Sequence, residues 1–210
     1  MTDTLRHNLG LSQHDATNRA AELLDRVGIP RGRDILRGYV HELSGGMRQR
    51  VMIALAISCG PSLIIADEPT TALDVTIQAQ VLDLLDDMRR EFNLAMLFIT
   101  HDLEVVGDFC DKAVVMYAGD VVERGSSADV VDHPAHPYAR GLIDAVPAHD
   151  DNRTRLTPIL GTVPPVGAWP DGCRFAPRCT RATDTCQTRP QLEQRGATAI
   201  RCWYPLERTS

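Results

Sequence analysis

Apolar residues recur at helical spacing in two long segments of the chain. One segment follows Ser12 and the other follows Asp74. Serine and aspartate are favoured immediately before a helix, because their side-chain oxygens accept hydrogen bonds from the unpaired N–H groups of the first turn. The spacing therefore predicts a helix over roughly residues 13–27 and a second helix from Asp74 to about Glu91.

Three continuous apolar runs have the length of strands and lie at residues 63–66, 94–99 and 113–117. Helical segments separate these runs, and alternation of strands with helices is typical of a sheet wound with helices. The third run is followed by a glycine-containing turn and a short strand at residues 121–123, which predicts a hairpin. We therefore expect an α/β fold with a mainly parallel sheet.

Polar side chains directly follow the first two predicted strands. Asp67 and Glu68 come after the first strand, and His101 comes after the second. Because the carboxyl ends of parallel strands meet at one edge of a sheet, we expect these three side chains to lie close together. Each also has a simpler interpretation, since an acidic pair can begin a loop and a histidine can cap a structural element.

A turn with the sequence Ser44-Gly45-Gly46 precedes an apolar helix that extends to about Ser58. The first N–H groups of a helix have no acceptor within it, and the helix dipole favours negative charge there. The turn therefore predicts an anion site, although two glycines can also form an ordinary turn. We expect the helix to be buried in the layered core, because it is apolar nearly all round.

Composition narrows the class of protein. The net charge of −6 gives no reason to expect a nucleic-acid partner. Apolar runs are too short for a membrane span and the first ten residues are polar, so we expect neither a transmembrane helix nor a signal peptide. The chain should then be cytosolic, where cysteines stay reduced or bind metal. Its charge changes from acidic to basic along the sequence, which indicates a boundary near Asp150.

Three motifs resemble those of the ATPase subunits of ABC transporters. The sequence LSGGMRQR at residues 43–50 is similar to the family's signature motif, LIIADE at residues 63–68 to its Walker B strand and catalytic glutamate, and Ala72-Leu73-Asp74 to its D-loop. The motifs also occur in the family's order and spacing. The resemblance implies part of a P-loop NTPase core of the ABC ATPase type.

This resemblance implies a role for each matching residue. Asp67 would hold Mg²⁺ through water, and Glu68 would polarise the attacking water as general base. His101 would contact the γ-phosphate of ATP and orient Glu68. In this family the signature motif of one subunit closes over the Walker A site of another, so ATP would be bound across a dimer interface. The residues implied on the signature and D-loop side are Ser44, Gly45, Gly46, Gln49 and Asp74.

One motif of the family is not found in these residues. A phosphate-binding P-loop reads G-x-x-x-x-G-K-[ST], and the chain's single lysine, Lys112, does not follow a glycine loop. We therefore expect the chain alone to be inactive in ATP hydrolysis, and we interpret it as a fragment of a truncated or frameshifted gene. Residues 1–42 would be a remnant of the α-helical subdomain, 43–132 the carboxyl-terminal half of the nucleotide-binding domain, and 133–210 an extension.

The extension resembles that of the oligopeptide/dipeptide importer ATPases, through His136-Pro137-Tyr138 and the sequence GCRFAPRC at residues 172–179. Its cysteines lack the C-x2-C pairs usual for structural zinc, so the residues alone leave open an iron–sulfur cluster, zinc, and free thiols or disulfides. The interleaved arginines would either form a solvated basic surface or stabilise an anionic cluster. The resemblance implies a [4Fe–4S] cluster bound by Cys173, Cys179, Cys186 and Cys202.

Together the resemblances imply an ATP-binding and ATP-hydrolysing subunit of an ABC importer for peptides or related solutes. It would use ATP and Mg²⁺ and lie peripherally at the cytoplasmic face of the membrane. Expected partners are a second ABC ATPase subunit, identical or different, membrane permease subunits and, indirectly, an extracytoplasmic solute-binding protein. Two alternatives stay open: a non-catalytic interaction module that supplies its signature motif to a partner ATPase, and a metal-cluster sensor.

Overall fold

The structure is a computed structural model that describes the chain in three segments, residues 1–71, 73–145 and 157–207. The chain divides into two compact units, Met1–His101 and Asp102–Ser210. Ala72, in the motif that resembles a D-loop, and the boundary expected near Asp150 lie outside the described residues.

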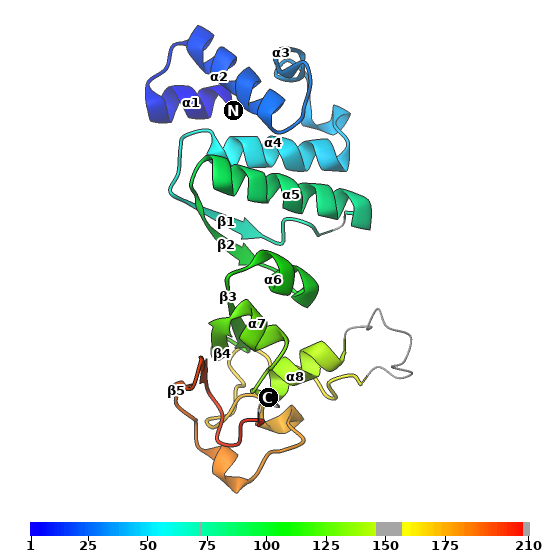
Figure 1. Cartoon of the computed structure of the whole chain (residues 1–210), viewed down its shortest axis with the longest axis vertical. Coiled ribbons are helices and arrows are strands. Elements are labelled where there is room, and N and C mark those ends of the chain that lie inside the picture. The colour runs from blue at the N-terminus through cyan, green and yellow to red at the C-terminus, as the bar shows by residue number, and fades with distance from the viewer. Residues whose placement is uncertain (72, 146–156, 208–210) are drawn as a thin grey trace. The chain divides into compact units, whose positions relative to one another are not determined.

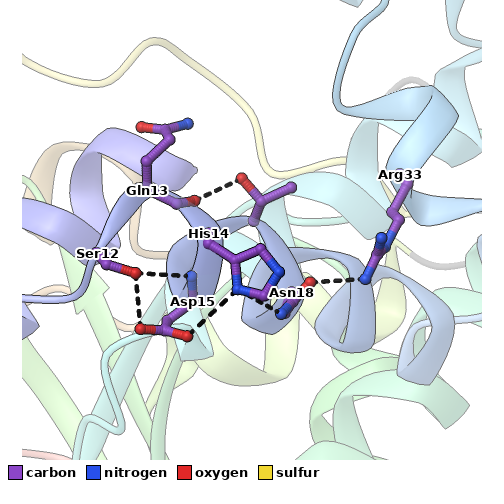
Figure 2. Close-up of polar contacts among 7 residues, drawn as sticks. Ser12, Gln13, His14, Asp15, Asn18 and Arg33 are labelled. Atoms are coloured by element: carbon purple, nitrogen blue, oxygen red, sulfur yellow. Dashed lines mark hydrogen bonds and ion pairs between the residues drawn. The ribbon is translucent and has the colours of Figure 1, made fainter.

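Helices make up most of the first unit. They are α1 (Thr2–Leu9), α2 (Gln13–Arg26), α3 (Gly32–Ile35), α4 (Gly45–Ile57) and α5 (Val75–Glu91), with a 3-10 turn at Val40–Glu42. The helix predicted after Ser12 is confirmed as α2, and Ser12 Oγ accepts a hydrogen bond from the Asp15 N–H at 3.1 Å (Figure 2). Figure 2 also shows how α3 is tied to α2, since Arg33 Nη2 donates to Asn18 Oδ1 at 2.6 Å.

A two-stranded parallel sheet of β1 (Leu63–Asp67) and β2 (Ala95–Ile99) completes the first unit. The strands pair in register along their whole length, so their carboxyl ends lie at one edge, as predicted. Ile64 and Ala66 are buried on one face of β1, whereas Ile65 on the other face is 63% exposed. The sheet therefore packs through one face only.

Two neighbouring helices cover this sheet. Helices α4 and α5 run side by side between the α1–α2 pair and the strands (Figure 1). Helix α4 buries one side only, and Met52 on that helix is exposed. The helix predicted to be buried in the layered core is therefore buried along one side only, because α2 and α5 contact only part of its surface. The apolar spacing after Asp74 predicts an inner face of five residues on α5. Four of them are buried, Val81, Leu84, Leu85 and Met88, and the fifth, Ile77, is half-buried.

The second unit contains short helices and short strands. They are α6 (Leu103–Phe109), β3 (Lys112–Tyr117), β4 (Asp120–Ser126), α7 (Ser127–Val131), α8 (Pro137–Asp144), β5 (Glu193–Arg195) and β6 (Thr198–Ile200), with 3-10 turns at Ala176–Arg178 and Asp184–Gln187. Its sheet is antiparallel, with strand order β3-β4-β6-β5. Across the described parts of both units, we find no helix with the length and apolar character of a membrane span.

The expectation of a mainly parallel sheet was wrong, because the four strands of the second unit are antiparallel. The predicted hairpin is confirmed as β3 and β4, and its turn explains the direction. Ala118 and Gly119 have φ values of 47° and 84°, which allow a two-residue turn to fold a strand back along its neighbour. Strands β5 and β6 were not predicted, because three residues are too few for a periodic pattern.

Aromatic rings from distant parts of the sequence form the core of the second unit. Phe175 is 4% exposed and meets the ring of Tyr117 in β3 edge to face, with the ring centroids 5.1 Å apart. The ring of Tyr138 in α8 lies 4.7 Å from that of Tyr117 and 5.3 Å from that of Phe175. The segment around the cysteines and the β3–β4 hairpin therefore share one core.

Candidate functional site

The carboxyl edge of the parallel sheet brings two residues of the predicted site into contact. Glu68 directly follows β1, and its N–H donates to the Ile99 carbonyl at 2.9 Å, which extends the strand pairing by one residue. His101 lies just beyond the end of β2. Its Nδ1 atom is 3.3 Å from Glu68 Oε1. The two side chains thus meet where adjacent parallel strands end.

Glu68 has an unusual backbone conformation, with a φ of 45°. A non-glycine residue in this left-handed region carries a strain of about 1–3 kcal/mol, and such strain clusters at functional sites. The carboxylate is held at both oxygens, because Oε2 accepts a hydrogen bond from Thr71 Oγ1 at 2.9 Å while Oε1 faces His101. The backbone and two neighbours therefore fix the direction of this carboxylate.

The neighbours of Glu68 also set its charge. The Thr71 hydroxyl, followed by His101, lowers the pKa of Glu68 below that of an ordinary glutamate. Glu68 is consequently ionised at neutral pH, which is the state that a general base requires. The side chains face solvent, with exposed fractions of 48% for Glu68 and 79% for His101. The pair is thus accessible to both water and a substrate.

Asp67 ends β1, and its side chain is exposed. Within the described residues, no three His, Cys, Asp or Glu side chains are grouped so that they could hold a metal ion. Mg²⁺ at nucleotide sites uses only one or two protein carboxylates, because water and phosphate oxygens fill its other positions. A single exposed carboxylate at this edge therefore fits Mg²⁺ that arrives with a nucleotide, and the role of Asp67 stays a prediction.

The turn before α4 has the features of an anion site. Ser44 caps the helix, because its Oγ accepts a hydrogen bond from the Met47 N–H at 3.3 Å. Gly45 and Gly46 form the first turn, where backbone N–H groups have no acceptor within the helix. Ser44 and Gly45 are both exposed. An anion could therefore approach the positive end of the helix dipole here.

The segment that resembles a D-loop lies against this turn. A Cβ atom on Gly46 would come within 3.2 Å of Ile77 Cγ2 in α5, so a larger residue would press on that helix. Asp74 caps α5 by accepting a hydrogen bond from the Ile77 N–H at 3.0 Å, and Gln49 is half-buried in α4. In the described residues, no hydrogen bond joins this group to Glu68, so the predicted site residues form two separate groups.

Arg50 links three helices of the first unit, a role that sequence reasoning missed. Its Nη1 donates to the Val27 carbonyl at the end of α2 at 2.7 Å, and its Nη2 donates to Gln80 Oε1 in α5 at 3.4 Å. A Cβ atom on Gly28 would lie 2.9 Å from the same guanidinium. The glycine that signals the end of α2 therefore also makes room for Arg50, and that glycine was the only hint of the contact.

One small cavity in the second unit, which we call the thiol cavity, collects the cysteines of the extension. Its volume is about 10 Å³, the space of roughly one water molecule. The Cys173 N–H donates to the Cys186 carbonyl at 2.9 Å, and a Cβ atom on Gly172 would lie 2.3 Å from that oxygen, so only glycine allows this approach. The cysteines that line the cavity are Cys173, Cys179, Cys186 and Cys202.

The four cysteines of this cavity are free thiols, of which Cys186 is buried and the other three are half-buried. Burial raises the pKa of Cys173 and of Cys179, and it raises the pKa of Cys202 to about 11. Thiols of this kind stay protonated and unreactive at neutral pH unless a metal displaces the proton. Cys173, Cys179 and Cys202 therefore have the character of inert thiols and not of reactive nucleophiles.

Two buried polar residues beside the cavity were not assigned a role from the sequence. Glu123 in β4 has no exposed surface, and its carboxylate accepts hydrogen bonds from the Ala135 N–H at 3.0 Å and the His136 N–H at 2.7 Å. His136 Nδ1 in turn accepts from the Tyr138 N–H at 3.0 Å and caps α8. The His-Pro-Tyr motif marked His136, but nothing in the sequence marked Glu123.

The arginines between the cysteines have a structural role that neither of the two expectations included. Arg174 stacks on Trp169, with its Cζ atom 3.7 Å from the ring centroid, and pairs with Asp120 at 3.4 Å. Arg189 pairs with the same buried carboxylate. These contacts hold the extension against the β3–β4 turn, whereas Arg181 lines the thiol cavity.

Comparisons with known proteins match two parts of the chain to related families. Residues 2–71 match the family described as ABC transporter, and residues 122–186 match the one described as oligopeptide/dipeptide transporter, C-terminal region. The chain is 48% identical over 205 residues to the oligopeptide transport ATP-binding protein AppD of Bacillus subtilis (strain 168), with 97% of the chain and 62% of that protein covered.

A second relative gives the same picture. The oligopeptide transport ATP-binding protein OppD of Salmonella typhimurium is 47% identical over 208 residues, which cover 99% of the chain and 62% of that protein. The chain thus spans less than two thirds of the length of these relatives.

Solved structures agree in fold. The structure of cbiO1 from Clostridium perfringens, described as part of the ABC transporter complex cbiONQ, superposes with a TM-score of 0.54 and 31% identity. The superposition covers 61% of the chain and 50% of cbiO1. The chain is therefore similar, over nearly its whole length, to ABC transporter ATP-binding proteins of the oligopeptide/dipeptide type.

Proposed function

We propose that the chain is the carboxyl-terminal part of an ATP-binding subunit of a peptide importer, in which ATP hydrolysis drives transport. The relatives named above are oligopeptide transport ATP-binding proteins. The observation that carries the proposal is the 3.3 Å contact between Glu68 and His101 where adjacent parallel strands end. It supplies an ionised base beside a second polar group on a rigid edge.

The residues at this edge divide the work of hydrolysis. Glu68 accepts a proton from the water that attacks the γ-phosphate, while Thr71 and His101 keep its two oxygens in place. Asp67 holds Mg²⁺ through water beside the phosphates. A P-loop must neutralise the phosphates, and these 210 residues contain no such motif, so the chain alone turns over no ATP.

The Ser44-Gly45-Gly46 turn, which we call the signature turn, contacts a nucleotide other than the one beside Glu68. Ser44, Gly45 and Gly46 bind the γ-phosphate held by the P-loop of a second ABC ATPase subunit, and Gln49 and Asp74 support that surface. Residues 1–42 belong to a helical subdomain that meets permease subunits at the cytoplasmic face of the membrane, residues 43–132 to the nucleotide-binding domain, and residues 133–210 to the extension. The free, capped start of α4 supports this proposal.

A chimaera tests the catalytic role of Glu68. The P-loop segment of AppD is fused before residue 1, and ATP turnover and ATP binding are measured separately. Glu68→Gln should lower turnover at least about 10²-fold and leave ATP binding in place, because a general base contributes on that scale. Glu22→Gln, which changes an exposed glutamate on α2, is the matched control. Unchanged turnover in Glu68→Gln would contradict the proposal.

We further propose that the thiol cavity holds a [4Fe–4S] cluster, as the resemblance to importer ATPases implies. Four reduced thiols line one cavity, but they are not grouped to share a single ion. The donor set supports the proposal, because a cluster takes four cysteine thiolates and distributes them over several iron atoms, but the cavity has room for only about one water molecule and would have to widen. When bound, the cluster would supply a one-electron redox centre.

Iron and acid-labile sulfide in the anaerobically purified chain test this second proposal. Cys186→Ser should lose both elements together with the visible absorption. Cys110→Ser is the matched control, because Cys110 belongs to the same unit and lies outside the cavity. A wild-type chain that contains neither iron nor sulfide would overturn the cluster and leave the nucleotide proposal untouched.

A further inference from the structure

The segment that joins α3 to the signature turn exposes two large apolar side chains beside two arginines. Tyr39 is 70% exposed and Val40 is 66% exposed. Arg37 lies two residues before Tyr39, and Arg31 directly precedes α3; both arginines are exposed. These four residues, which we call the Arg–Tyr patch, lie within ten consecutive residues of the first unit. Tyrosine and arginine are the residue types that contribute most binding energy at protein interfaces.

Tyr39 is exposed and yet fixed in place. Its N–H donates a hydrogen bond to Glu42 Oε2 at 2.8 Å. Its ring stacks with that of His41, with the ring centroids 5.5 Å apart and the ring planes 14° apart. A Cβ atom on Gly38 would lie 2.8 Å from the same carboxylate oxygen, so a larger residue there would displace Glu42 from Tyr39. A side chain that is already fixed loses little conformational freedom when it binds a partner.

The arginines give the patch a positive charge. Among the described residues, neither Arg31 nor Arg37 has a hydrogen bond or an ion pair through its guanidinium. Of the nearby acids, Asp34 is exposed, and Glu42 is bonded to the Tyr39 N–H. The patch is thus locally basic in a chain with a net charge of −6. A guanidinium can bind a carboxylate through two parallel N–H···O bonds, so the patch is complementary to an acidic partner.

We propose that the Arg–Tyr patch is a docking site for an acidic peptide segment of a partner protein, one that also carries an aliphatic side chain. The carboxylates of the segment pair with Arg31 and Arg37, and its aliphatic side chain packs on Tyr39 and Val40. Apolar burial supplies affinity, whereas the charge pairs orient the segment and speed its association. The patch uses no residue of the nucleotide site, so the inference goes beyond the proposed function and does not depend on it.

A labelled probe peptide with glutamate and leucine on one helical face tests the docking site. Its binding to the purified full chain is followed by fluorescence anisotropy. Tyr39→Ala and Arg37→Gln should each weaken binding about fivefold or more. Because both residues are exposed, the melting temperature should not change. Arg19→Gln, which changes an exposed arginine on α2, is the matched control and should bind like the wild type. A peptide with lysine in place of glutamate should not bind.

Two changes at Glu42 separate the fixed ring from a general charge effect. Glu42→Gln keeps an acceptor for the Tyr39 N–H and should bind the probe at least as tightly as the wild type. Glu42→Ala removes that acceptor and should weaken binding, although it also removes a negative charge that repels the probe. Tighter binding in both variants would contradict the role of the fixed ring.

Three other results would overturn the docking site itself. They are no binding of the glutamate peptide to the wild type, binding that is unchanged in Tyr39→Ala and Arg37→Gln, and equal binding of the lysine peptide. Self-association of the wild-type chain that these two variants abolish would also overturn it, because a second copy would then occupy the patch. Each of these results leaves the proposed nucleotide chemistry at Glu68 untouched.

Discussion

The two units hold their reactive groups in opposite environments. At the sheet edge of the first unit, Glu68 and His101 face solvent and contact each other and Thr71. In the second unit, the ring of His136 and four thiols enclose a cavity no larger than a water molecule. An exposed pair can accept a mobile substrate and a second protein, whereas an enclosed set of donors can only hold a resident group. The exposed pair is the one to which we assign turnover in the proposed function, and the buried donors of the second unit are those of the proposed resident group.

The stabilising contacts follow the same division. The first unit leaves one face of its sheet exposed and accepts a strained backbone at Glu68. The second unit has a core of aromatic rings that meet edge to face, and a buried carboxylate, Asp120, that two arginines share. Substitutions at the edge of the first unit should therefore change chemistry with little change in stability, and substitutions around the cavity should do the reverse.

Removal of the central ring of the second unit should have the largest effect on stability. Phe175→Ala should lower the free energy of unfolding by about 3–5 kcal/mol, because it leaves a cavity among three aromatic neighbours. Leu160→Ala, at a residue 75% exposed, should change it by less than about 0.5 kcal/mol. Denaturant unfolding measures both values. Equal effects would show that the second unit is not closed around Phe175.

Loss of charge at Asp120 should have the next largest effect. Asp120→Asn leaves Arg174 and Arg189 without their ionised acceptor and should destabilise the chain by about 1–3 kcal/mol. The matched change is Asp86→Asn in α5, whose partners Arg89 and Arg90 lie on the same helix. Helical pairs of this kind contribute about 0.3–0.5 kcal/mol. A larger loss at Asp86 than at Asp120, measured by thermal melting, would reverse the comparison.

A helix cap in the first unit should have a smaller effect. Asp74→Ala removes the acceptor of the Ile77 N–H and should destabilise the chain by about 1 kcal/mol. Asp74→Asn preserves an acceptor and should be nearly neutral in the same melting experiment. If both variants melted like the wild type, the hydrogen bond from the Ile77 N–H to Asp74 would contribute nothing to stability.

The smallest expected change is a shift in the titration of Glu68. The Thr71 hydroxyl is the main cause of its lowered pKa, so Thr71→Val should raise that pKa toward the ordinary glutamate value. A lowered pKa keeps the carboxylate ionised as pH falls, and the variant should therefore become protonated at a higher pH than the wild type. Carbon-13 NMR of labelled glutamate measures the pKa of Glu68 directly, and Thr17→Val is the control. A downward shift would contradict the assigned hydrogen bond.

Local rules predicted the elements of the first unit well. The caps Ser12 and Asp74 and the apolar spacing after them identified α2 and α5, and two apolar runs identified β1 and β2. These features depend on residues within one or two turns of each other. The meeting of Glu68 with His101 followed from the direction of the two strands alone.

The second unit was harder to predict, because its structure depends on contacts between distant residues. The antiparallel direction of β3 and β4 depends on the positive φ values at Ala118 and Gly119. Of these two residues, only the glycine is a turn signal in the sequence. The hydrogen bond from the His136 N–H to Glu123 joins residues on either side of α7, and no periodic pattern in the sequence indicates it. The resemblance to importer ATPases implied a shared site for the four cysteines, yet it could not reveal that His136 lines the same cavity.

ATP turnover by a P-loop-containing partner subunit tests the proposed role of the Ser44-Gly45-Gly46 turn most directly. The chain is added to that partner, and stimulation is compared among variants. Ser44→Arg should abolish stimulation, whereas Ser12→Arg, which removes an equivalent helix cap far from the signature turn, should preserve it. Glu68→Gln should also preserve it, because Glu68 belongs to a site without a P-loop. Full stimulation by Ser44→Arg would contradict the account.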